Sequence, residues 1–191
     1  MDRTAPLLEV IVAFQDFLRN TALEALTSLS SENRARAARE SDADTLFGID
    51  EVVEAPALEW LDEHWPKNEP AHLVMEGVDE KLRVIPRKAL STKPLWILLV
   101  DPIDGTRPLM HLKRSAWILT GLAPRGSTVP TLESIVVGAM TEIPLPQARW
   151  SEQFLAIQGH EVSGWRYYLD TGVKEPCEVG PSSSEILDFG F

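Results

Sequence analysis

Apolar residues recur at two different spacings along this chain, and the change of spacing divides it into two parts. Between residues 6 and 29 they recur every three or four positions, which predicts an amphipathic helix. That stripe is Leu7, Ile11, Phe14 and Leu18. A similar stripe after Gly48 predicts a second helix, which stops at Trp65 and Pro66. Pro56 either kinks this helix or is tolerated within its first two turns.

Beyond residue 70 the apolar residues gather in short runs instead, which predicts strands. The predicted strands are 72–75, 95–100, 115–123, 134–142 and 152–158, and 162–170 is a strand or a hairpin arm. Residues 77–94 hold two prolines and mixed charge, so we expect a loop or a loose hairpin there. Helices followed by strands predict one α+β domain over 1–191. We expect a layered α/β sandwich with two amino-terminal helices packed on a mainly antiparallel sheet.

Composition narrows the class of protein. With 44% hydrophobic and 25% charged residues the chain has a globular profile, and no apolar run is long enough to cross a membrane. A net charge of −11 argues against nucleic acid as a partner, and we interpret Arg34 and Arg36 as a solvated helix end. Cys177 is the only cysteine, which excludes an internal disulfide and a cysteine-based zinc site. We expect a cytoplasmic protein.

The stretch "WILLVDPIDGT", residues 96–106, joins a buried strand to two acids. Asp101 and Asp104 can face a common point because Pro102 turns the chain sharply, and Gly105 lets the backbone approach a ligand. Pro108 suits the first position of a helix, whose free N–H groups favour an anion. Carboxylates beside a phosphate site are typical of Mg²⁺ binding. The alternative interpretation is that both acids only cap a turn and a helix.

The segment "DPIDGT" resembles the signature of the inositol monophosphatase family of Mg²⁺-dependent, lithium-sensitive phosphatases. Three other segments are similar to the family and occur in its order: "DADTLFGID" at 42–50, Met75-Glu76, and the strand pair at 134–162. The resemblance implies the fold of the family's sugar-phosphatase-like amino-terminal domain. It also implies a phosphomonoesterase acting on a small phosphorylated polyol, sugar or nucleotide, in a protein that forms a homodimer.

Carried onto this chain, the resemblance assigns residue roles. The implied metal ligands are Glu76, Asp101, Asp104 and the carbonyl of Ile103. Thr106 would orient the attacking water, and Asp50 would accept the proton of that hydroxyl, so that Asp50, Thr106 and Glu76 form the catalytic set. The N–H groups of Gly105 and Thr106 would hold the phosphate.

The chain also departs from the family pattern. Gly77 follows Glu76 where the family usually has a second glutamate, and Arg107 and Pro108 replace small polar residues. Family members continue into a second α/β half with a further metal-binding aspartate, which we expect this chain to lack. The alternative hypothesis is therefore a non-catalytic metal- or anion-binding domain. The four histidines show no ligand spacing, and we expect them to be surface or core residues.

Overall fold

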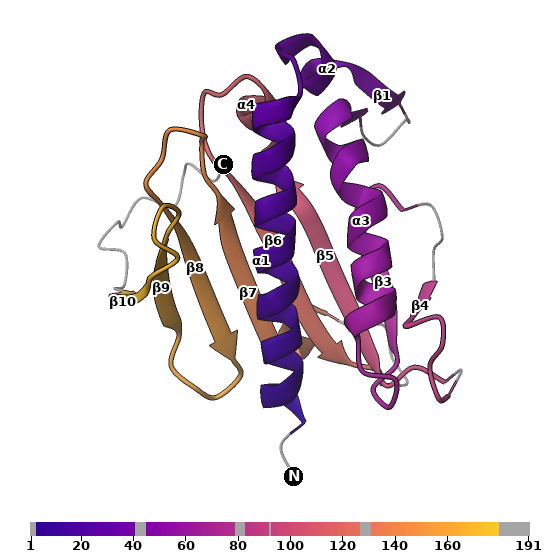
Figure 1. Ribbon diagram of the computed structural model, residues 1–191. Coiled ribbons are helices and arrows are strands. Elements are labelled where there is room, and N and C mark those ends of the chain that lie inside the picture. The colour runs from indigo at the N-terminus through magenta and orange to yellow at the C-terminus, as the bar shows by residue number, and fades with distance from the viewer. Residues whose placement is uncertain (1–2, 41–44, 79–82, 92, 127–130, 180–191) are drawn as a thin grey trace.

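Helices cover one face of a single large sheet in the computed structural model, which describes residues 3–40, 45–78, 83–91, 93–126 and 131–179 (Figure 1). The helices are α1 (Thr4–Ser28), α2 (Ser31–Ala35), α3 (Gly48–His64) and α4 (Thr106–Met110), with a 3₁₀ turn at Leu132–Ser134. This confirms the predicted α+β class and the helix layer on the sheet. Within the described residues, no helix has the length and apolar character needed to cross a membrane.

The sheet has eight strands in the order β10-β9-β8-β7-β6-β5-β3-β4. Their bounds are β3 (Ala71–Met75), β4 (Arg83–Ile85), β5 (Trp96–Asp104), β6 (Ala116–Pro124), β7 (Val137–Ile143), β8 (Trp150–Ile157), β9 (Ser163–Tyr168) and β10 (Lys174–Cys177). Every neighbouring pair is antiparallel except β3 and β5, which run parallel. Two further strands, β1 (Ala37–Glu40) and β2 (Thr45–Phe47), pair with each other beside the helices.

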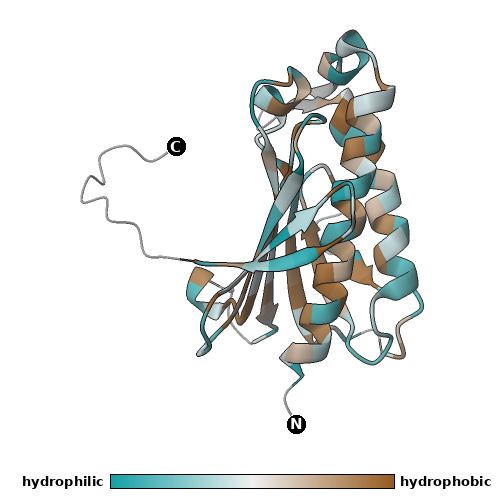
Figure 2. Cartoon of the chain, turned by 60° about the vertical axis from the view of Figure 1, so that its left-hand side comes forward, coloured by the Kyte–Doolittle hydropathy of each residue, from teal (hydrophilic) through white to brown (hydrophobic). Residues whose placement is uncertain are grey.

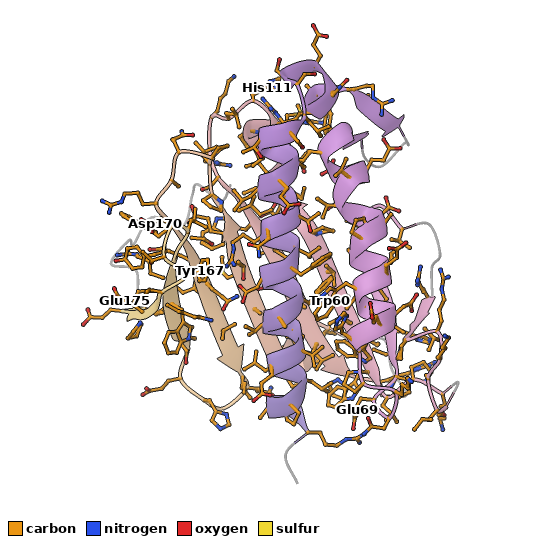
Figure 3. All side chains as sticks on the ribbon, in the orientation of Figure 1. Trp60, Glu69, His111, Tyr167, Asp170 and Glu175 are labelled. Atoms are coloured by element: carbon orange, nitrogen blue, oxygen red, sulfur yellow. The ribbon has the colours of Figure 1, made fainter. Side chains whose placement is uncertain are left out.

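The core lies between the helices and one face of the sheet. The predicted stripe of α1 is buried there, and Phe14 packs against Trp60 of α3 with ring centroids 5.4 Å apart. Figure 3 labels Trp60 on α3. Along the strands, burial alternates: Leu98 and Ile118 are fully buried under the helices, whereas their neighbours Leu99 and Leu119 are half-buried on the other face.

A buried polar cluster fixes α1 on the sheet. The amide nitrogen of Gln15 donates to the Thr120 hydroxyl (3.0 Å) and to the Ala139 carbonyl (2.9 Å), and its oxygen accepts from the Thr141 hydroxyl (2.6 Å). Gln153 donates in turn to Thr141 (2.9 Å). Because buried polar groups are costly unless they are paired, these bonds select one position of α1 along the sheet.

The structure also corrects several expectations. The helix α3 continues through Pro56, and the helix expected to begin at Pro108 begins two residues earlier, at Thr106. For residues 77–94 the hairpin alternative agrees with the structure, because β4 pairs antiparallel with β3. Strands β1, β2 and β10 were not predicted.

Candidate active site

The acids of the candidate site stand at the ends of two parallel strands. In the register of β3 and β5, Met75 lies opposite Val100, and the Glu76 amide donates to the Val100 carbonyl (3.1 Å). Glu76, which directly follows β3, and Asp101 in β5 therefore lie side by side at the same end of the two strands. The Ile103 amide donates to Asp101 Oδ1 (3.1 Å). This hydrogen bond begins the turn that was predicted at Asp101 and Pro102.

The turn itself depends on Gly105. Its φ of 96° is in the left-handed region, which a residue with a side chain rarely adopts, and it directly precedes α4. The pairing of β5 with β6 is irregular between Asp101 and Asp104, so the strand bends as it ends. These two features bring the loop at residues 101–106 back towards the beginning of α3.

Asp50 uses its two carboxylate oxygens for two different purposes. Oδ2 accepts from the Phe47 amide (2.8 Å) and caps the first turn of α3. Oδ1 lies 3.0 Å from the Thr106 hydroxyl, which is also 2.8 Å from the Ile103 carbonyl. A hydroxyl has a single proton, and both neighbours are acceptors, so Thr106 donates towards one of them and keeps lone pairs that can accept from water.

These residues line one cleft of about 300 Å³. The lining consists of Phe47, Asp50, Glu76, Asp101, Ile103, Asp104, Gly105, Thr106, Arg107 and Pro108. All seven residues predicted for the site are therefore brought together at this cleft. Its four carboxylates face one cation, Arg107, so the cleft favours positively charged ligands.

The carboxylates at the cleft and the Ile103 carbonyl are groups of the type that binds Mg²⁺, because hard cations prefer carboxylate and carbonyl oxygens as ligands. In the part of the chain that the structure describes, no three His, Cys, Asp or Glu side chains form a group that could hold a metal. Mg²⁺ usually keeps several waters and needs only one or two carboxylates together with substrate oxygens, so the residues fit the ion in that mode.

Arg34 is a buried positioning residue. It was expected to be solvated, but its side chain is buried and donates to the carbonyls of Leu26 (2.9 Å), Leu29 (2.7 Å) and Met110 (3.1 Å). The end of α1 leaves backbone carbonyls without helical partners, and the guanidinium satisfies them. Because Met110 ends α4, Arg34 also ties α1 to the helix that carries Thr106. Local sequence gives no sign of this contact. Arg36 is exposed, as expected, and pairs with Glu51 (3.0 Å).

The shifted pKa of another ionisable residue on the same sheet, His72, is explained by its surroundings. His72 is four residues before Glu76 in β3 and is buried, with Nε2 3.4 Å from Nη1 of Arg125. Burial, and then the nearby Arg125 charge, lower the pKa of His72 below its ordinary value. The imidazole is therefore neutral at pH 7, as expected for a core histidine.

Compared by sequence, the chain matches no protein-family model and no curated protein. Compared by structure, it is similar to the extragenic suppressor protein SuhB from Bartonella henselae, with a TM-score of 0.58 and 18% identity over 86% of this chain and 52% of that one. A putative sedoheptulose-1,7-bisphosphatase from Toxoplasma gondii gives a TM-score of 0.60 and 14% identity over 92% and 55%. The staphylococcal inositol monophosphatase-1 gives 0.57 and 14% over 85% and 51%.

The chain has the fold of these proteins. Identities this low show the fold alone, and they do not carry residue roles from one protein to another. The chain spans about half the length of the solved structures that it matches. The fold predicted from "DPIDGT" is confirmed, whereas the roles of the seven site residues stay predictions.

Proposed function

We propose that this protein is a Mg²⁺-dependent phosphomonoesterase acting on a small phosphorylated polyol, sugar or nucleotide. The observation that carries the proposal is the position of the Thr106 hydroxyl, between Asp50 and the Ile103 carbonyl, in a cleft with three further carboxylates. The resemblance of "DPIDGT" to the inositol monophosphatase signature, and the fold shared with two named phosphatases, support it.

In this proposal Glu76, Asp101, Asp104 and the Ile103 carbonyl hold the metal. When bound, Mg²⁺ supplies positive charge that lowers the pKa of water and offsets the charge of the phosphoryl group. Thr106 accepts a hydrogen bond from the attacking water and so fixes its direction. Asp50 holds the Thr106 proton away from that water, which keeps the hydroxyl oxygen available as an acceptor. The amides of Gly105 and Thr106 bind the phosphate.

The alternative is a domain that binds a metal or an anion without turnover. One observation favours it: the described residues contain no ready group of three metal-binding side chains. The first hypothesis requires both Mg²⁺ binding at the cleft and phosphate release, whereas the alternative requires binding of a metal or an anion without release. A cytoplasmic location and a homodimer are further predictions from the sequence.

The test is phosphate release from a panel of inositol, sugar and nucleotide monophosphates, with MgCl₂ or with EDTA. We expect release only with Mg²⁺, and a loss of about a hundredfold or more in Thr106→Ala, since a general acid–base arrangement contributes about that much. Thr27→Ala, the same change at an exposed position of α1, is the control. The staphylococcal protein was solved as a LiCl inhibitory complex, so we also expect inhibition by Li⁺. Mg²⁺ binding without phosphate release would favour the alternative, and absence of Mg²⁺ binding would contradict the proposed phosphatase.

A further inference from the structure

The sheet face opposite the helices carries a large apolar groove. Figure 2 shows both long helices on one side of the sheet. On the other side lies a groove of about 640 Å³, within the range of about 300–1,000 Å³ that is usual for small-molecule sites. Its main apolar residues are Val74, Leu99, Leu119, Met140, Phe154 and Ala156. Val74 is 47% exposed, so apolar surface on this face is in contact with water.

The groove is continuous with the acidic cleft, because Glu76 and Asp101 line both. In the register of β5 to β8, the residues paired in turn across from Asp101 are Leu119, Met140 and Phe154. Directly paired residues point to the same face of a sheet, so one acid and three apolar side chains form a row across four strands. At about 4.8 Å per strand, Phe154 is roughly 14 Å from Asp101. A ligand held at Asp101 can therefore extend over this row.

Charge is confined to one end of the groove. Among the described residues that line it, only Glu76 and Asp101 carry charge. The next row on the same face, further from the acids, begins at Leu99 and continues through Gly121 and Gly138. A ligand that fits the whole groove therefore has one end that suits a metal ion bound at the acids, and an apolar remainder.

The floor of the groove is hollow because small residues meet there in register. Gly121 pairs with Gly138, which pairs with Ala156, so three adjacent strands present almost no side chain at this level. A Cβ added to Gly121 would lie 3.2 Å from Cδ1 of Ile135, whereas a Cβ added to Gly138 would have no atom within 4 Å. The hollow therefore lies over Gly138 and Ala156, and it has room for a hydrocarbon group.

We propose that the groove binds the alcohol part of the substrate, and that the preferred substrates are phosphate monoesters whose alcohol carries an apolar hydrocarbon group. This inference rests on the proposed function, since the phosphate end is placed at the acidic cleft. Hydrolysis consumes one water, breaks the P–O bond of the ester, and gives inorganic phosphate and the alcohol, which takes a proton from that water. A bare polyol is a poorer substrate, because its hydroxyl groups would face apolar walls without hydrogen-bond partners.

A series of alkyl phosphates tests the inference through turnover. Burying one methylene group is worth up to about fourfold, so kcat/KM with Mg²⁺ should be at least about tenfold higher for hexyl phosphate than for ethyl phosphate. Gly138→Leu places a side chain in the hollow and should lower this hexyl-to-ethyl ratio at least about fivefold. Thr27→Leu, which adds the same side chain at an exposed position of α1, is the control and should keep the ratio. Equal kcat/KM values across the series, or a ratio unchanged by Gly138→Leu, would overturn the inference.

A binding measurement separates this inference from the proposed function. Ethylphosphonate and hexylphosphonate cannot be hydrolysed as esters, and calorimetry in MgCl₂ should show hexylphosphonate binding at least about tenfold more tightly. That preference should be lost in Gly138→Leu and kept in Thr27→Leu. Preferential binding without hydrolysis of any ester would contradict the phosphatase and support the groove as the site of the apolar group. Hydrolysis of esters without any preference for the longer chain would overturn the groove assignment and leave the phosphatase standing.

Discussion

The two faces of the eight-stranded sheet are made of alternate residues of the same strands, yet they serve different purposes. On the helix side, Leu98 and Ile118 are fully excluded from water by α1 and α3. On the other side, Leu99 and Leu119 line an open groove that ends at the acids of the cleft. The comparison indicates that burial on the helix face supplies most of the stability, while the other face keeps acids and apolar groups in contact with water.

The largest expected effect on stability is the loss from truncating Ile118 on the helix face, compared with truncating its neighbour Leu119 on the open face. Ile118→Ala leaves a cavity under the helices and should lower the free energy of unfolding by about 3 kcal/mol, whereas Leu119→Ala on the open face should cost about 1 kcal/mol. Urea unfolding, with the midpoint and slope compared, measures both. Equal losses would show that the open face is as well packed as the helix face.

Replacing Arg34 tests the link between the helix layer and the site. Arg34→Met keeps much of the volume but leaves the carbonyls of Leu26, Leu29 and Met110 without this donor, so we expect a loss of about 2 kcal/mol. Arg36→Met removes only an exposed ion pair and should change the unfolding midpoint little. If the two variants unfolded at the same urea concentration, Arg34 would not be a structural cap.

Asp101 should show the opposite behaviour, with little effect on stability and a large effect on binding. Asp101→Asn retains the oxygen that accepts from the Ile103 amide but removes one charge from the proposed metal ligands. We expect an unchanged urea midpoint and no Mg²⁺ binding detectable by calorimetry. Glu161→Gln neutralises an exposed acid in the β8–β9 loop and is the control. Unchanged Mg²⁺ affinity in Asp101→Asn would remove Asp101 from the site.

The parts of the fold that the sequence predicted correctly are those with a strong local pattern. The stripe of Leu7, Ile11 and Phe14 and the buried run before Asp101 show their period within a few residues. Strand β10, "KEPC", is polar and at the sheet edge, so its pairing with β9 is determined by tertiary structure. The burial of Arg34 likewise depends on Met110, 76 residues away.

The same distinction applies to the candidate site. Asp101, Asp104 and Gly105 could be proposed from one short segment, because turn chemistry and two acids are local signals. Asp50 is 56 residues from Thr106, and only the resemblance to a family suggested the pair before the structure placed them 3.0 Å apart. The sequence left open whether Asp50 caps α3 or accepts from Thr106. The structure shows one carboxylate oxygen in each position.

The most direct test of the central claim is a double-mutant cycle on that pair. In Asp50→Asn the amide oxygen can still cap α3, but the NH₂ group cannot accept the Thr106 proton. Mg²⁺-dependent phosphate release should fall about a hundredfold in Asp50→Asn and in Thr106→Ala, with fold and Mg²⁺ binding retained, and the double variant should be scarcely worse than either, because the pair acts as a unit. Losses that multiply in the double variant would contradict the account and leave Thr106 as a turn residue.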